Sequence, residues 1–253
     1  MVIQTAYVDV PVANRQMRTF IARPREAGPH PGIVFYSDIF QLTPSTLRWC
    51  VRLAGYGFLV AAPEIYHRIE PPGTVLEFDD EGKVRGQSDA EATPVADFDE
   101  DVRGLLAYLE SHEAVSTIGA AGHCTGGHIA FRAAMEPQIK ATACWYATGL
   151  HDGKLGEDAD AGSLARAGEI GGELLTIWGT RDPHTPEAER GVVRAGLSGL
   201  GDRLTWREYD AEHAFGRDVG DRYDPAVTDE AFAETIALFR RARPAAPRSA
   251  GPS

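Results

Sequence analysis

The chain has 253 residues, 43% of them hydrophobic, and a chain of this length can bury one sizeable core. We expect one domain over residues 1–243 and a disordered tail over residues 244–253, where Pro, Ala, Ser and Gly predominate. The formal net charge of −12 argues against nucleic acid and anionic membranes as partners, because polyphosphate is bound through Lys and Arg.

The N-terminal residues contain neither the basic stretch nor the apolar stretch of a secretory signal, and no apolar run reaches the roughly 18 residues that span a bilayer. The three cysteines, Cys50, Cys124 and Cys144, have no Cys-x-x-Cys spacing, so they indicate neither a disulfide framework nor a zinc ribbon. We therefore expect a cytoplasmic protein without membrane contact. The sequence leaves open whether it is a monomer or a homodimer.

Short apolar runs alternate with stretches of helical period along the chain, a pattern typical of a mostly parallel sheet covered by helices on both faces. The first two runs lie close together and predict an antiparallel hairpin at one edge. The predicted fold class is therefore α/β, with about eight strands at residues 6–10, 17–22, 32–36, 58–62, 115–121, 141–146, 174–178 and 204–209.

Two helices are predicted from the spacing of their apolar residues. One follows Pro94, where Asp97 and Glu100 have the spacing of a capping box and the apolar residues of 98–109 share one face. The other follows Thr228 and closes the C-terminus against the core.

Two segments, 68–94 and 149–172, do not fit this alternation. Both are rich in glycine and acidic residues and are predicted to be long excursions from the sheet. Long loops in compact domains are often lids or binding loops, and disordered surface insertions are the alternative that the sequence leaves open.

The strand predicted at 115–121 runs into Gly122-His123-Cys124-Thr125-Gly126-Gly127 and then into a helical stretch. This is the pattern of a nucleophile elbow, with cysteine as the nucleophile. Glycines are needed there because backbone and helix approach too closely for β-carbons. The helix N-terminus favours a thiolate, and the amide of Thr125 can stabilise an oxyanion. A phosphate-binding turn or a merely buried cysteine is the alternative.

A nucleophile needs a base, and α/β-hydrolases supply an acid and then a histidine in loops after later strands. Asp182 follows the strand at 174–178, and His213 follows the strand at 204–209. We predict that His213 takes the thiol proton and that Asp182 orients the imidazole. Asp210 and Glu212 flank the histidine and are the alternative acids.

His123 and His128 flank Cys124. They do not predict a metal site, because no second cysteine lies at ligand spacing and a glycine turn fits poorly around a tetrahedral ion. The expected chemistry needs no cofactor.

With these residues the chain resembles the dienelactone hydrolases (carboxymethylenebutenolidases) over nearly its whole length. The resemblance implies an α/β-hydrolase fold and an oxyanion hole made by the amides of Ile39 and Thr125. It is carried by Ser37-Asp38-Ile39-Phe40, Ala62-Pro63-Glu64-Ile65-Tyr66-His67-Arg68, the Cys124 elbow, Gly179-Thr180-Arg181-Asp182 and His213-Ala214-Phe215-Gly216-Arg217.

The resemblance also implies substrate-binding positions. Arg217 and Arg85 are expected to bind a substrate carboxylate, although a surface ion pair is the alternative for each arginine. Tyr66 belongs to a matching stretch, and His123 replaces the aromatic residue common before the cysteine, so both are expected at the pocket.

One residue departs from the family pattern. Asp38 stands where the family usually has a glutamate that hydrogen-bonds the resting thiol. Aspartate is one methylene shorter, so the resemblance implies a thiol-modulating role for Asp38 without securing its reach to Cys124. A substrate other than dienelactone is compatible with this change.

The predicted function is hydrolysis of a small ester or lactone, anionic or neutral, through a thioester acyl-enzyme on Cys124. A tailoring esterase, thioesterase or cyclase acting on a secondary metabolite would use the same three residues. A non-catalytic binding protein on a hydrolase scaffold is the alternative from another class.

Overall fold

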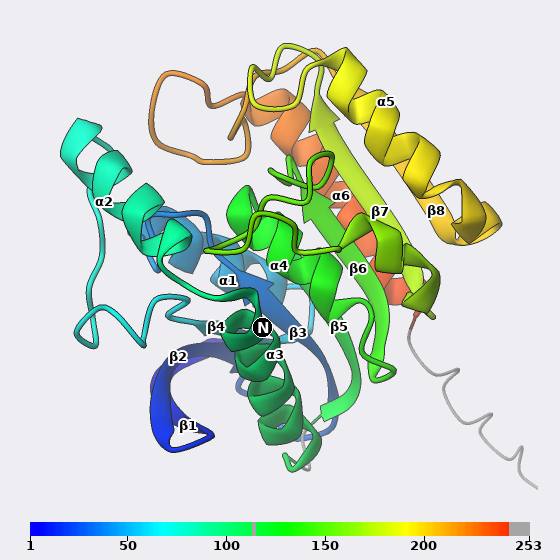
Figure 1. Ribbon diagram of the computed structural model, residues 1–253. Coiled ribbons are helices and arrows are strands. Elements are labelled where there is room, and N and C mark those ends of the chain that lie inside the picture. The colour runs from blue at the N-terminus through cyan, green and yellow to red at the C-terminus, as the bar shows by residue number, and fades with distance from the viewer. Residues whose placement is uncertain (113–114, 243–253) are drawn as a thin grey trace, which may run out of the picture.

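The structure, a computed structural model, describes residues 1–112 and 115–242. Its centre is an eight-stranded sheet in the order β1-β2-β4-β3-β5-β6-β7-β8 (Figure 1). β1 and β2 form the predicted antiparallel edge hairpin, and β3 to β8 run parallel. All eight predicted strands are confirmed, as β1 (Ile3–Val12), β2 (Arg15–Pro24), β3 (His30–Tyr36), β4 (Leu59–Pro63), β5 (Val115–His123), β6 (Ile139–Trp145), β7 (Glu173–Gly179) and β8 (Leu204–Tyr209).

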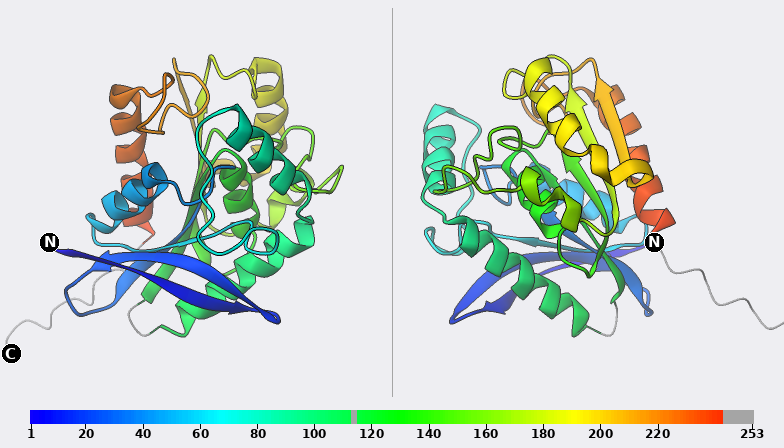
Figure 2. Two further views of the ribbon diagram at one scale, coloured as in Figure 1. Left: turned by 90° about the vertical axis from the view of Figure 1, so that its left-hand side faces the viewer. Right: turned by 45° about the vertical axis from the view of Figure 1, so that its right-hand side comes forward.

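Helices cover both faces of this sheet, as predicted (Figure 2). α3 and α4 pack on one face, where Val34 and Tyr36 point, and α1 and α6 pack on the other, where Ile33 and Phe35 point. This alternation along one strand is what a sheet buried on both sides requires. The helices are α1 (Pro44–Ala54), α2 (Asp80–Glu91), α3 (Val95–Glu110), α4 (Thr125–Ala133), α5 (Glu187–Gly196) and α6 (Pro225–Arg241), with 3₁₀ turns η1 (Leu164–Glu169) and η2 (Ser198–Arg203).

The segment 68–94 is not a plain excursion, because it contains the three-turn helix α2. This helix has no apolar stripe, and its buried residues are Gly82, Gly86 and Asp89. It begins at a side-chain cap, since Asp79 accepts a hydrogen bond from the amide of Gly82 at 2.8 Å. Hydrophobic periodicity could not reveal a helix of this kind.

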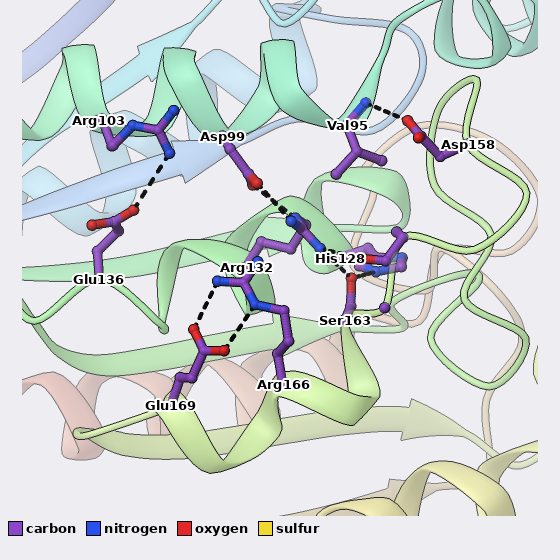
Figure 3. A network of polar contacts seen from close by, with 12 residues as sticks. Val95, Asp99, Arg103, His128, Arg132, Glu136, Asp158, Ser163, Arg166 and Glu169 are labelled. Atoms are coloured by element: carbon purple, nitrogen blue, oxygen red, sulfur yellow. Dashed lines mark hydrogen bonds and ion pairs between the residues drawn. The ribbon is translucent and has the colours of Figure 1, made fainter.

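The two predicted helices exist, and α3 begins directly after Pro94, as predicted. The helix expected after Thr228 already begins at Pro225, behind a cap made by Asp224. The capping box expected at the start of α3 does not form. Instead, the carboxylate of Asp158 accepts from the amide of Val95 at 2.8 Å (Figure 3).

The segment 149–172 is docked onto the body through such contacts. The amide of Glu157 also donates to the carbonyl of Thr93, and a β-carbon on Gly156 would lie 2.1 Å from that oxygen. Of the two alternatives for this segment, the structure therefore does not support a disordered insertion. The predicted tail at 244–253 lies outside the described residues.

The parallel strands bring their carboxyl ends to the same edge of the sheet, which is where α/β proteins build their sites. The loops after β3, β5, β6, β7 and β8 therefore converge there. Within residues 1–112 and 115–242, no helix has the length and hydropathy of a transmembrane span.

Candidate active site

The turn between β5 and α4 holds Cys124 in a strained conformation. Its φ of 56° and ψ of −121° are rarely adopted by a residue with a side chain. The glycines around it are required sterically: a β-carbon on Gly122 would lie 2.0 Å from the carbonyl oxygen of Gly126, and one on Gly126 would lie 2.1 Å from that of Ser37. The turn therefore has the geometry of the predicted nucleophile elbow.

Cys124 is the cysteine that reaches the candidate site. Its side chain is partly exposed and lines a cavity of about 570 Å³ at the carboxyl edge of the sheet. Cys50 and Cys144 are fully buried in the core, and burial raises the pKa of both thiols far above the ordinary value. Only Cys124, among the three, is placed to meet a substrate.

Asp182 and His213 meet in the loops after β7 and β8. Nδ1 of His213 lies 2.6 Å from Oδ2 of Asp182, and both side chains are buried. The carboxylate also accepts from the amide of His184 at 2.8 Å. Burial alone would raise the pKa of Asp182, but the hydrogen bond and charge of His213 lower it below the usual value. Asp182 is therefore an anion that lies against the imidazole.

The alternative acids are engaged elsewhere. Asp210 pairs with Arg181 at 2.9 Å and is 86% exposed, so it is too solvated to orient a buried ring. Glu212 pairs with Arg222 at 3.6 Å. Neither carboxylate makes a hydrogen bond to His213 within the described part of the chain.

His213 is electrostatically coupled to the cysteine. Burial would lower the pKa of His213, but the charge and hydrogen bond of Cys124, together with Asp182, raise it to about 10. Both side chains line the cavity. An imidazole held next to a thiol is the arrangement that activation of a cysteine nucleophile requires.

The amides of Ile39 and Thr125 fit the predicted oxyanion hole. Both residues line the cavity beside Cys124. Neither amide donates a hydrogen bond to any residue of 1–112 or 115–242. Free N–H groups next to a nucleophile are the donors that a tetrahedral oxyanion requires.

Asp38 faces an arginine rather than the thiol. Its carboxylate accepts from the amide of Phe40 at 3.0 Å and lies 3.5 Å from Nη1 of Arg217. Burial raises the pKa of Asp38, although Arg217 opposes the shift. Among the described residues, no hydrogen bond joins Asp38 to Cys124, so the shorter side chain leaves the resting thiol to other partners.

Arg217 lines the cavity and lies over two aromatic rings. Its guanidinium carbon is 5.1 Å from the ring centre of Phe40 and 4.4 Å from that of Phe78. The Asp38 carboxylate 3.5 Å away neutralises part of its charge. Arg217 is therefore a cation of the cavity wall whose position is set by Asp38 and by two aromatic rings.

Three of the predicted substrate-binding residues do not line the cavity. Arg85 makes two hydrogen bonds of 2.6 Å to Glu70 on the outer side of α2, the ion-pair alternative. His123 points into an aromatic cluster, 4.6 Å from the ring of Trp49, and burial lowers its pKa to about 3. Tyr66 is buried in the hydrophobic core.

The cavity wall includes residues that were not predicted from the sequence. His184 packs edge-on against His213 with ring centres 4.7 Å apart. Thr148 places its hydroxyl 3.9 Å from the sulfur of Cys124. Both excursions border the cavity, with Phe78, Lys83, Gln87 and Glu91 from one and His151, Lys154 and Leu155 from the other.

Comparison with known proteins identifies the family. The model of the "Dienelactone hydrolase family" matches residues 17–243. The chain belongs to the dienelactone hydrolase family. It is therefore a hydrolase of carboxylic esters, as predicted, and not merely a binding protein on this scaffold.

Relatives of the family match over most of their length. A Saccharomyces cerevisiae protein named "Putative carboxymethylenebutenolidase" is 32% identical over 252 residues, covering 94% of this chain and 89% of its own. The "Carboxymethylenebutenolidase" of Pseudomonas sp. strain P51 is 27% identical, covering 86% and 87%. A Klebsiella pneumoniae structure named "Putative Dienelactone Hydrolase" superposes with a TM-score of 0.81 at 24% identity, covering 95% and 100%. The α/β-hydrolase fold is thereby confirmed.

Proposed function

We propose that this dienelactone hydrolase relative cleaves a small ester or lactone with Cys124 as nucleophile, His213 as acid and base, and Asp182 as the group that orients His213. The observation that carries the proposal is the buried 2.6 Å contact between Asp182 and His213, with His213 coupled to the cavity-lining thiol. The order of the three residues along the chain is that of α/β-hydrolases.

The first half-reaction makes a thioester. The thiolate of Cys124 attacks the carbonyl carbon, and the electron pair of the C=O bond moves to an oxygen held by the amides of Ile39 and Thr125. As the tetrahedral adduct collapses, the C–O bond breaks and His213 gives its Nε2 proton to the leaving oxygen. In a lactone the leaving alcohol stays attached to the acyl group.

The second half-reaction uses water. Neutral His213 takes a proton from a water molecule that attacks the thioester carbon, and the oxyanion is held by the same two amides. Collapse expels the Cys124 thiolate and releases the carboxylic acid. The imidazolium that remains faces the thiolate again, so the starting charges are restored.

A dienelactone-like substrate is an anionic lactone, as the family implies, and Arg217 is the cavity cation proposed to receive its carboxylate. A bulkier ester or acyl thioester is the second candidate. It is favoured by the cavity volume of about 570 Å³ and by the apolar wall of Phe40, Phe78 and Leu155.

Hydrolysis of dienelactone and of p-nitrophenyl esters by Cys124→Ala, His213→Ala and wild type tests the proposal. Removing the general base should lower turnover by about 10²- to 10⁴-fold, and Cys124→Ala should abolish it. Cys144→Ala is the matched control, because that thiol is buried away from the cavity. Near wild-type turnover by His213→Ala would rule out the assignment.

A further inference from the structure

A buried polar network connects the nucleophile to the segment 149–172, and it uses residues that the proposed mechanism does not. It joins Thr148, His128, Ser163, Arg132 and Asp99. Figure 3 shows its far part, where Arg132 lies between Asp99 and Ser163, next to His128.

Thr148 touches the nucleophilic residue twice. Its backbone amide donates to the carbonyl oxygen of Cys124 at 3.4 Å, and its hydroxyl lies 3.9 Å from the sulfur, within reach of a hydrogen bond to sulfur. Asp38 makes no bond to this thiol among the described residues. Apart from His213, Thr148 is the residue of 1–112 and 115–242 whose side chain makes a hydrogen-bond contact with the Cys124 sulfur.

His128 holds Thr148 from the first turn of α4. Its ring is fully buried, with Nδ1 at 2.9 Å from the carbonyl oxygen of Thr148 and Nε2 at 2.7 Å from the hydroxyl of Ser163. A carbonyl only accepts, so Nδ1 carries the proton. Burial lowers the pKa of His128 to about 4, so the ring is neutral and Nε2 accepts from Ser163.

Arg132 completes the chain of donors. Its Nη1 donates to the Ser163 hydroxyl at 2.9 Å and to the carbonyl of Ala161 at 2.8 Å. Its other nitrogens form a bidentate pair with Asp99 of α3, at 2.7 and 2.6 Å. The donors thus run in one direction, from Arg132 to Ser163, to His128 and to the backbone of Thr148.

We propose that Thr148 is a catalytic residue whose hydroxyl donates a hydrogen bond to the Cys124 thiolate, and that His128 is a positioning residue that holds Thr148 in place. This inference rests on the proposed role of Cys124 as nucleophile. A fixed O–H donor next to the sulfur stabilises the negative charge of the thiolate.

The test is the pH dependence of Cys124 alkylation by iodoacetamide, which reacts with the thiolate. Thr148→Val and Thr148→Ala both remove the hydroxyl, and we expect the midpoint of the alkylation profile to rise, with a rate at pH 7 lower by about tenfold. Thr148→Ser keeps the hydroxyl and should restore both values. Other titratable groups coupled to the thiol, His213, Tyr66 and Tyr146, are the same in all variants.

Thr176→Val is the matched control. Thr176 is fully buried in β7, and within the described residues its hydroxyl has no hydrogen-bond partner. The same substitution there should leave the profile unchanged. An unmoved midpoint in both Thr148→Val and Thr148→Ala would overturn the inference.

Two substitutions of His128 test its positioning role. His128→Asn keeps an N–H donor near the position of Nδ1, whereas His128→Leu removes it. The midpoint should rise in His128→Leu and return toward wild type in His128→Asn, which loss of packing alone would not produce. Equal midpoints in the two variants would show that His128 only fills space.

The outcome that contradicts the proposed function differs from the outcome that contradicts only the role of Thr148. If Cys124→Ala keeps its esterase activity, Cys124 is not the nucleophile, and both proposals fall. If Cys124→Ala is inactive while the Thr148 variants alkylate like wild type, only the role of Thr148 is wrong.

Discussion

Gly86 of α2 lies directly against the carbonyl of Ile39. A β-carbon on Gly86 would stand 2.4 Å from that oxygen and 3.1 Å from its carbon. Helix α2 therefore rests on the residue whose amide is proposed for the oxyanion hole. The surface helix that periodicity missed is thus part of the support of the candidate site.

Substituting Gly86 by alanine should lower kcat. The added methyl group must displace either α2 or the Ile39 loop, and a misplaced oxyanion donor costs on the order of 10²-fold in turnover. Steady-state kinetics on p-nitrophenyl acetate measure the effect. Gly191→Ala in α5 is the matched control, because a β-carbon there meets nothing within 4 Å. Equal kcat values for the two variants would contradict the role given to α2.

Asp182→Asn should change the pH dependence of turnover as well as its size. Burial opposes the charge of His213, while Cys124 and Asp182 raise its pKa to about 10, so the imidazolium is lost as the pH rises through that value. Without the Asp182 charge the pKa falls, and the alkaline limb of kcat/KM should move to lower pH. Turnover should also fall by about 10² or more. The pH–rate profile, corrected for spontaneous hydrolysis, provides the measurement.

Asp210→Asn is the control for that change. It removes a carboxylate from the loop that carries His213, but one that pairs with Arg181 in solvent. Its alkaline limb should coincide with that of wild type. If the alkaline limb moves equally in both variants, the net charge of the protein, and not the hydrogen bond between Asp182 and His213, determines the pH dependence of kcat/KM.

Much of the fold follows from local patterns in the sequence. Strands buried on both faces must be apolar throughout, so runs such as 174–178 reveal them. Helix α2 could not be found in this way, because its buried residues, Gly82, Gly86 and Asp89, form no apolar stripe. It is held by contacts outside the helix, including the pair of Arg85 and Glu70 and the close approach of Gly86 to Ile39.

The candidate site was predictable where its signal is local. The glycines around Cys124 are dictated by the turn itself, and the acid and histidine follow strands in a fixed order. Whether an arginine faces the cavity or pairs with a carboxylate of the protein depends on the tertiary fold. The sequence alone could therefore not show that Arg217 lines the cavity and that Arg85 pairs with Glu70. The contact of Thr148 with the sulfur likewise arises only when β5 and β6 pair.

Asp89 and Glu70 should make the stability of the protein depend on pH. Both side chains are almost fully buried. Burial and the nearby charge of Glu70 raise the pKa of Asp89 to about 6, whereas Arg85 lowers the pKa of Glu70. An acid whose folded pKa lies above its unfolded value costs stability as the pH rises through the interval between them, here about 4 to 6.

Asp89→Asn should therefore raise Tm at pH 8 by about 2 °C or more, with little gain at pH 4. Melting curves at the two pH values measure the difference. Asp80→Asn, at an exposed position of the same helix, should change Tm similarly at both. A gain for Asp89→Asn that is equal at pH 4 and pH 8 would contradict the assigned pKa.

Arg217→Gln should separate anionic from neutral substrates. The guanidinium is the cation proposed to receive a substrate carboxylate, and a lost charge-assisted hydrogen bond costs about 1.5–3 kcal/mol, or roughly 10- to 150-fold in KM for an anionic lactone. KM for a neutral p-nitrophenyl ester should stay within about threefold, because that substrate has no carboxylate for Arg217 to bind. Arg241→Gln is the matched control, since Arg241 pairs with Glu173 at 3.0 Å and does not line the cavity. If KM rises equally for both substrates in Arg217→Gln, the arginine shapes the pocket through Phe40 and Phe78 and does not bind the substrate carboxylate.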